Sequence, residues 1–262
     1  MSDADFSTPD RVTLPGHGPR SLGPLQLAPP PPARFAAALR LGALAARARI
    51  FRRPTALAAI LGLALIAVAT VIERRLGSAG AVDRVLGGTF RLIIPLVTFG
   101  VAVAATGHDR LREAVWPLAR YGAARRDIAL GTVLCAMAAS AALAALFAVV
   151  SVVLAHTPGE PPLLRDAFQS AWIGALTAAA YAAWFCFGAV FWKRGRGRWI
   201  PLLLDLLLGT STGLFGAVFP RGNAQNLLGG AAALHLSQPA SCGVLALSAL
   251  GLALTASLIV RE

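Results

Sequence analysis

GHDRLREAVWPLARYGAARRD, residues 107–127, is the longest polar stretch in the apolar body of the chain and separates two long hydrophobic segments. Its arginines are Arg110, Arg112, Arg120, Arg125 and Arg126. Leu111, Val115 and Leu118 recur at helical spacing, which predicts a short helix over residues 109–120. Asp109 is a candidate cap for its start, and Pro117 limits its length. A cationic helix of this kind either orients the neighbouring membrane segments or docks a partner.

The composition around this loop is that of a membrane protein. The 262 residues are 56% hydrophobic, with a mean hydropathy of +0.67. A bilayer core of about 30 Å needs roughly 20 helical residues, and six apolar runs approach or exceed that length. They cover residues 55–72, 85–106, 128–155, 167–192, 199–219 and 242–260. The sequence therefore predicts an all-α, polytopic membrane bundle of six transmembrane helices, with a kink at Pro95 in the second.

The N-terminal part divides into two further segments. Residues 1–33 contain eight of the 17 prolines and are expected to be a disordered cytoplasmic tail. Residues 34–53 mix apolar residues with six arginines, a pattern typical of a helix that lies in the membrane surface. The chain is thus divided into a Pro-rich tail, residues 1–33, and a six-span membrane domain, residues 34–262.

Charge distribution sets the expected orientation, because inner loops of membrane proteins carry an excess of Lys and Arg. With the N-terminus inside, 18 of the 24 Lys and Arg residues, Arg198 among them, lie on the inner side and 5, Arg221 among them, on the outer side, while Arg91 falls within a span. Both termini are therefore predicted to be cytoplasmic. Orientation also accounts for the net charge of +12, so no nucleic-acid partner is expected.

Two charged residues fall inside predicted spans, where charge is costly. Asp205 and Arg91 lie about 9 Å deep from opposite sides at roughly 1.5 Å per residue. In a core of about 30 Å this leaves roughly 12 Å between them along the membrane normal, too far for an ion pair. Asp205 is then expected either to face an inner cavity or arginines such as Arg198, or to line a substrate path, while Arg91 extends outward.

The stretch 209–213, GTSTG, lies in the same predicted span. With Gly216, it is predicted to form a helical face of small residues, for packing within the bundle or for a dimer contact. Thr210 and Thr212 are candidate substrate-path residues with Asp205.

No signature of catalysis or of a cofactor is present in the sequence. The motifs GxxxxGK[ST], HExxH and GxSxG are absent, and the four histidines are scattered. Cys135, Cys186 and Cys242 are expected to be buried, inert thiols. The chain is therefore not expected to be an enzyme or to bind a metal or other cofactor.

Residues 220–241 are polar, then mildly apolar, then polar again, which suits a re-entrant or interfacial helix around residues 227–236. Together with the surface helix, the six spans and the loop 107–127, this arrangement resembles the permease subunit of ABC-2 type transporters. YGAARRDIALG, residues 121–131, resembles the family motif that enters the third span, although Ala124 and Thr132 depart from it. The resemblance covers about residues 35–260.

The resemblance implies an exporter permease of the bacterial cytoplasmic (inner) membrane, surrounded by lipid. Two such subunits, identical or related, would pair with two ABC ATP-binding subunits that hydrolyse ATP. Leu111, Val115 and Trp116 would be the apolar contacts to the ATPase, with Arg112 and Glu113 as polar ones. The alternatives are a membrane assembly or binding protein without an ATPase partner, and an intramembrane enzyme built around Asp205.

Overall fold

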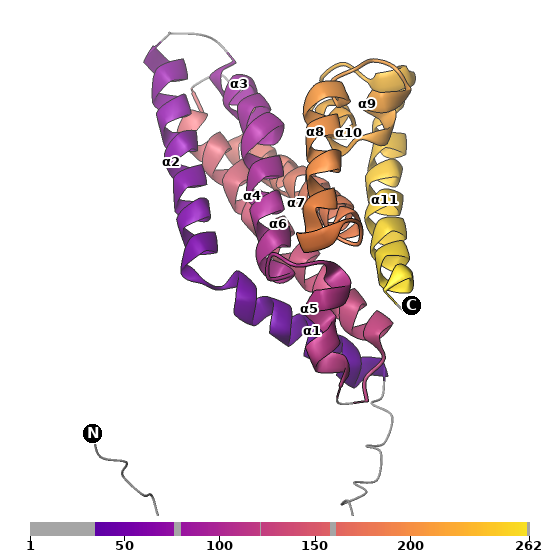
Figure 1. Ribbon diagram of the computed structural model, residues 1–262. Coiled ribbons are helices and arrows are strands. Elements are labelled where there is room, and N and C mark those ends of the chain that lie inside the picture. The colour runs from indigo at the N-terminus through magenta and orange to yellow at the C-terminus, as the bar shows by residue number, and fades with distance from the viewer. Residues whose placement is uncertain (1–34, 76–79, 121, 158–160, 261–262) are drawn as a thin grey trace, which may run out of the picture. The chain divides into compact units, whose positions relative to one another are not determined.

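The computed structural model describes residues 35–75, 80–120, 122–157 and 161–260, which form helices joined by short connections (Figure 1). No strand occurs in these four ranges, so the all-α prediction is confirmed for them. The predicted tail, residues 1–33, lies outside the described residues, and its expected disorder stays a prediction.

Five helices of the described part are long and apolar enough to cross a membrane. They are α2 (Arg53–Arg75), the continuous run of α3 (Ala81–Gly88), η1 (Thr89–Ile93) and α4 (Ile94–Ala105), α6 (Arg125–Ala155), α7 (Leu163–Gly188) and α11 (Gln238–Ile259). They match the predicted first, second, third, fourth and sixth spans, and they indicate a multi-pass membrane protein.

The two ends of the bundle differ in what they carry. The short helix α5 (Leu111–Ala119) and the 3-10 helix η2 (Lys193–Arg198) lie at the end where α1 (Phe35–Ile50) crosses beneath the bundle (Figure 1). We call this the α5 end. The last turn of α2, the first turn of α3 and the segments between α8 (Trp199–Leu208) and α11 lie at the opposite end (Figure 1).

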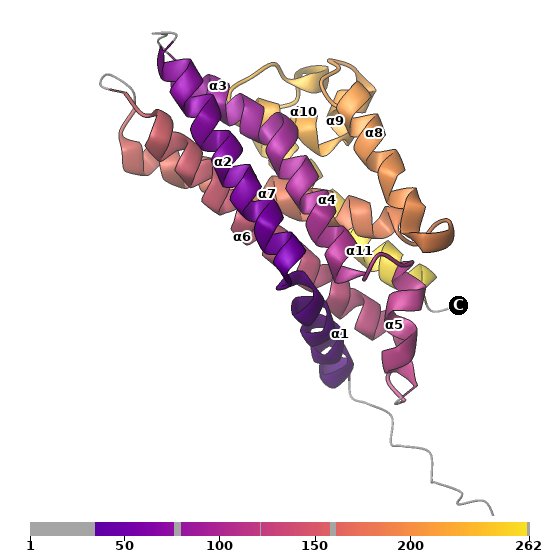
Figure 2. The same ribbon diagram turned by 60° about the vertical axis from the view of Figure 1, so that its left-hand side comes forward.

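The centre of the bundle is formed by α6 and α7, which pack along each other, with α11 packed against both. The largest fully buried side chains include Phe147 of α6 and Tyr181 and Phe185 of α7. Gly174 of α7 lies so close to α6 that an added Cβ would lie 3.0 Å from the carbonyl oxygen of Ala144. Helix α2 lies at the outside of the bundle and exposes most of its large apolar side chains, as a helix facing lipid does (Figure 2).

The predicted irregularity in the second span lies just before Pro95. Residues 89–93 form a π-helical turn, and Pro95 is the second residue of α4. A proline lacks the N–H that would continue the α-helical ladder, and a π-turn shifts that ladder by one residue. The hydroxyls of Thr89 and Ser151, 2.9 Å apart, share a hydrogen bond that fixes this turn against α6.

Helix α1 packs against the start of α6 through a stripe of small residues. Ala38, Gly42 and Ala46, one turn apart, are buried. An added Cβ at Gly42 would collide with the carbonyl oxygen of Ile128, so the two backbones touch. Such stripes allow helices to approach closely. The predicted helix over residues 34–53 therefore exists from Phe35 to Ile50, and its large apolar residues Phe35 and Leu44 remain exposed.

The predicted fifth span, residues 199–219, is not one continuous helix. Helix α8 (Trp199–Leu208) has only 10 residues, and residues 209–213 form a turn. Two short helices follow, α9 (Leu214–Val218) and α10 (Pro220–Leu227). The predicted helix around residues 227–236 is also displaced, because that stretch is a turn with one 3-10 segment, η3 (Ala233–His235).

Candidate functional site

Helix α5 begins two residues later than the predicted start at residue 109. Its first residue is Leu111, after an extended Arg110, and no side chain of Asp109 caps it. Instead, the Glu113 carboxylate reaches back and accepts a hydrogen bond from the Arg110 backbone N–H at 3.2 Å. Pro117 stands in the last turn, and the helix ends at Ala119, which agrees with the expected limit.

The five residues predicted to contact an ATPase divide between the two faces of α5. Leu111 and Val115 are 0% and 1% exposed, so they attach α5 to its own bundle. Arg112, Glu113 and Trp116 are exposed, and the Trp116 side chain keeps 43% of its surface. The guanidinium carbon of Arg120 lies 3.8 Å from the centre of the Trp116 ring. The surface that α5 offers to a partner is therefore Arg112, Glu113, Trp116 and Arg120.

Helix α5 is fastened to the end of α7 by two hydrogen bonds. The Leu111 backbone N–H donates to the carbonyl oxygen of Ala189 at 3.3 Å. The Nε of Arg110 donates to the carbonyl oxygen of Trp192 at 2.6 Å. Both acceptors lie in the residues that follow α7, so the start of α5 is hydrogen-bonded to that end of α7.

Arg198, predicted as an orientation charge, is instead a buried connector at 3% exposure. Its Nη2 donates to the hydroxyl of Thr106 at 2.9 Å and to the carbonyl oxygen of Asp109 at 2.8 Å. Burial lowers the pKa of Arg198 below its ordinary value. It joins the segment before α8 to the connection between α4 and α5. This role was not predictable from the sequence, because Arg198 closes a run of loop cations.

Arg49 makes the corresponding connection from α1. Its Nη1 donates to the carbonyl oxygen of Ala105 and its Nη2 to that of Ala114, both at 3.2 Å. Its pKa is lowered, first by burial and then by the neighbouring charge of Arg52. Through Arg49, Arg110 and Arg198, the segment from Thr106 to Ala119 is bonded to α1, to the end of α7 and to the start of α8.

A second polar centre lies inside the bundle. The carboxylate of Asp205 in α8 and the guanidinium of Arg221 in α10 are 1% and 3% exposed, and Arg221 Nε lies 3.2 Å from Asp205 Oδ2. The Tyr181 hydroxyl donates to the same oxygen at 2.8 Å, and the Arg221 backbone N–H donates to Oδ1 at 3.3 Å. Arg221 Nη2 also donates to the carbonyl oxygen of Arg91 at 2.6 Å. The pair therefore ties together η1, α7, α8 and α10.

The predicted environment of Asp205 was partly wrong. Its partner is Arg221, which the topology count placed in an outer loop, rather than Arg198 or an empty cavity. The side chain of Arg91 is exposed, as expected, and contributes only its backbone carbonyl. Thr210 and Thr212 are exposed in the turn after α8, and neither touches Asp205 through a hydrogen bond in the described part of the chain. Asp205, Thr210 and Thr212, which were predicted to line a substrate path, therefore do not share one surface.

The predicted face of small residues is a tight turn instead of a helical face. An added Cβ at Gly216 would collide with the carbonyl oxygen of Ser211, and one at Gly222 with that of Gly216. The Gly216 N–H donates to the Ser211 hydroxyl at 2.9 Å. The glycines therefore serve to fold α9 and α10 back against the end of α8.

Asparagines complete this fold by binding backbone carbonyls that the short helices leave open. Asn223 Nδ2 donates to the carbonyl oxygens of Ala217 and Phe219 at 2.7 and 3.1 Å. Asn226 Nδ2 donates to the carbonyl oxygen of Leu236 and to the Ser241 hydroxyl, both at 2.8 Å. Irregular backbone inside a membrane is stable where protein groups satisfy it in this way.

Within the described ranges, no group of three His, Cys, Asp or Glu side chains is arranged to hold a metal ion. Of the free thiols, Cys186 is buried and Cys135 and Cys242 are half-buried. The site thus consists of two polar centres. One is the set of hydrogen bonds from Arg49, Arg110 and Arg198 around α5, and the other is the Asp205–Arg221 ion pair inside the bundle. No protein family, curated protein or solved structure that we compared with the chain matches it, so its function is inferred from these contacts.

Proposed function

We propose that the chain is the permease subunit of an ATP-driven ABC-2 type exporter, coupled to a separate ATPase through the loop 107–127. The observation that supports this most is that one face of α5 is packed against the bundle while the other is exposed. A coupling helix has to be held firmly by the membrane helices on one face and be open to a partner on the other. Leu111 and Val115 are buried against the bundle and fill the first role, and Arg112, Glu113 and Trp116 are exposed on the other face.

The hydrogen bonds around α5 indicate how a movement of α5 would be passed to the membrane helices. A displacement of α5 reaches α1 through Arg49, the end of α7 through Arg110 and the start of α8 through Arg198. A partner that binds α5 more tightly in one arrangement of these helices would shift the population toward that arrangement. ATP-driven closure of an ATPase pair would supply such a difference.

The broken segment α8–α10 is proposed as the fifth crossing, which gives six crossings in all, with both termini on the cytoplasmic side. Helix α8 starts at the α5 end and α11 starts at the opposite end (Figure 1). At about 1.5 Å per residue, α8 rises roughly 15 Å, half of the bilayer core. The turn and α9 complete the passage, and the basic α5 end is the cytoplasmic one.

The proposal is tested by isolating the intact chain from its native membrane and identifying the proteins that remain bound. We expect an ATP-binding subunit with a GxxxxGK[ST] loop, whose ATP hydrolysis rises when the chain is added back. Trp116→Ala combined with Arg112→Glu should weaken this association roughly 30-fold, since truncation of one interface tryptophan costs about 2 kcal/mol or more. Trp172→Ala, a 39%-exposed tryptophan of α7, is the matched control.

Leu111→Asp is unsuitable as the decisive variant, because it would bury an unpaired carboxylate and unfold α5 whatever its function. If no ATP-binding protein is retained, or if both tryptophan variants behave alike, the permease proposal fails. The remaining candidate is then a membrane assembly or binding protein that works without an ATPase.

A further inference from the structure

A strongly cationic hollow lies at the α5 end, where α5 meets the loop after α7. It has a volume of about 610 Å³ and is lined by Arg110, Trp192, Lys193, Arg194 and Arg196. Four of these five residues are cations, and none is acidic. Lys193, Arg194 and Arg196 are exposed, so the hollow is open to solutes and lipid headgroups from that end.

A second, apolar slot borders this hollow. Its volume is about 270 Å³, and it runs between the last turns of α7 and the first turns of α8. Its walls include Trp184, Phe187, Ile200 and Leu204. Trp192 lines both the slot and the cationic hollow, so the two spaces meet at this residue.

We propose that the slot and the hollow together bind one anionic phospholipid, its acyl chain in the slot and its phosphate among the four cations. Arginine and lysine are the side chains that bind phosphate, and clusters of them beside membrane helices attract anionic lipids. Trp192 and Trp199 are 59% and 52% exposed and lie next to the cluster. Exposed tryptophans at the end of a membrane helix mark the depth of the headgroups.

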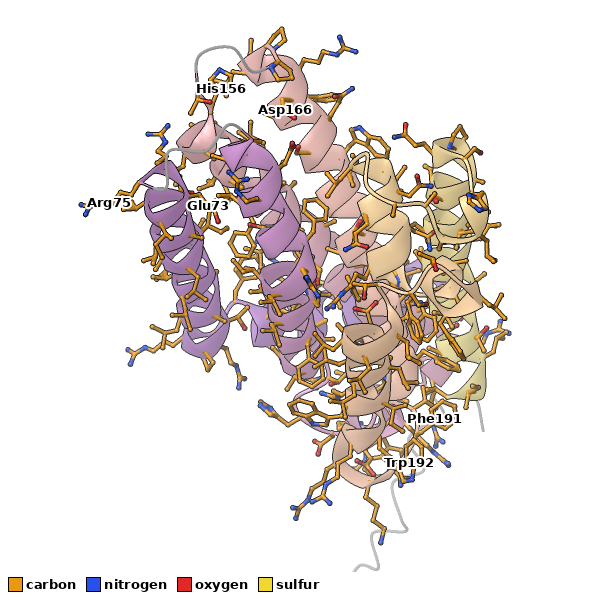
Figure 3. The ribbon with its side chains drawn as sticks, turned by 90° about the horizontal axis from the view of Figure 1, so that it is seen from above. Glu73, Arg75, His156, Asp166, Phe191 and Trp192 are labelled. Carbon is orange, nitrogen blue, oxygen red and sulfur yellow. The ribbon has the colours of Figure 1, made fainter. Side chains whose placement is uncertain are left out.

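The backbone of the loop gathers the cations around the hollow. Trp192, Arg194 and Gly195 have φ angles of 56°, 57° and 58°, in the left-handed region. This conformation is unfavourable for Trp192 and Arg194, so surrounding contacts have to maintain it. The bond from Arg110 Nε to the Trp192 carbonyl is one such contact. A phosphate bound here would lie against Arg110, the residue that precedes α5. Figure 3 labels Phe191 and Trp192, which lie in the loop after α7.

The test uses the full chain in nanodiscs that contain equal amounts of phosphatidylglycerol and phosphatidylcholine. After detergent extraction, native mass spectrometry counts the lipids that remain bound. We expect phosphatidylglycerol to be retained at least tenfold over phosphatidylcholine. The triple variant Lys193→Gln, Arg194→Gln, Arg196→Gln should abolish this preference, and Leu204→Trp, which fills the slot, should reduce retention of both lipids. Arg110 is left unchanged because its side chain also holds Trp192.

The matched control removes three exposed cations elsewhere at the same end: Arg40→Gln, Arg52→Gln, Arg53→Gln. It should retain phosphatidylglycerol as the unaltered chain does. Equal loss in both triple variants would mean a diffuse surface field and would overturn the proposal. Displacement of the lipid by millimolar inorganic phosphate would also overturn the proposal. It would mean that the site binds a phosphate group alone and holds no acyl chain. The folded state of each variant is checked by circular dichroism and elution volume.

Discussion

Gly131 of α6 lies directly against the backbone of Leu39 in α1, so that any side chain at position 131 would collide with the Leu39 carbonyl oxygen. Gly42 makes the reciprocal contact with Ile128. Thr132 adds a long hydrogen bond of 3.4 Å from its hydroxyl to the carbonyl oxygen of Gly42. Gly131 is the glycine that ends the stretch YGAARRDIALG, and the structure gives it a physical role: it lets α1 seat on α6.

Gly131→Ala is therefore expected to separate α1 from α6 and to destabilise the protein by about 1–3 kcal/mol, the usual cost of overpacking. Thermal unfolding of the protein in detergent measures the change. Gly100→Ala in α4 is the control, because an added Cβ there meets nothing within 4 Å. Both variants gain the same helix propensity, so their difference isolates the collision. Equal melting temperatures would show that α1 does not need this contact.

Arg221→Leu is expected to destabilise the bundle strongly, because it leaves the Asp205 carboxylate buried without its cation. Breaking a buried ion pair from one side costs about 3–5 kcal/mol. The double variant Asp205→Leu, Arg221→Leu should recover much of that loss, since two apolar residues leave no unpaired charge. Denaturant unfolding of both single variants and of the double variant completes the cycle. A double variant no more stable than Arg221→Leu would contradict the ion pair as the source of the effect.

Arg49→Met should loosen α5 without unfolding the bundle. Hydrogen bonds from a charged group contribute about 1.5–3 kcal/mol, and because Arg49 is half-exposed we expect about 1 kcal/mol after solvent screening. Amide hydrogen exchange across α5 should then quicken roughly fivefold while exchange in α11 is unchanged. Arg47→Met, on the exposed side of the same helix, should have no such effect. Faster exchange throughout the chain would show a global rather than a local role.

Gly222→Ala is expected to disrupt the fold of α8–α10, because its methyl group would collide with the carbonyl oxygen of Gly216. The expected loss of stability is about 1–3 kcal/mol, with increased protease cleavage between α9 and α11. Gly213→Ala, in the turn between α8 and α9, has open space around the added atom and a negative φ, so it should be tolerated. Similar cleavage of both variants would mean that the turn does not depend on close backbone approach.

The sequence predicted the spans whose apolar length alone decides their structure. α2, α6, α7 and α11 are such segments, and their observed limits lie within a few residues of the expected ones. The prediction of one helix over residues 199–219 was wrong because a hydropathy scale treats Gly209 and Thr210 as neutral. In the structure the helix ends at these residues. The predicted position of Arg221 was wrong because a topology count places every loop arginine in water. The carboxylate that pairs with Arg221 belongs to another helix.

The pattern in α5 was informative but incomplete. Helical spacing correctly singled out Leu111 and Val115 as one apolar face. Spacing does not state whether a face is covered by the same chain or by a partner, and here the chain itself covers it. The bonds of Arg49 and Arg198 to backbone carbonyls have no sequence signature, because a carbonyl is present at every position.

The break between α8 and α10 has a consequence for how the chain is made. Asp205 leaves the ribosome 16 residues before Arg221, the residue that neutralises it. α8 is 10 residues long and carries an unpaired carboxylate at that moment, so it is too short and too polar to partition into lipid by itself. If this segment crosses the membrane as proposed, we expect α8, α9 and α10 to enter it together, with the charge of Asp205 already paired to Arg221.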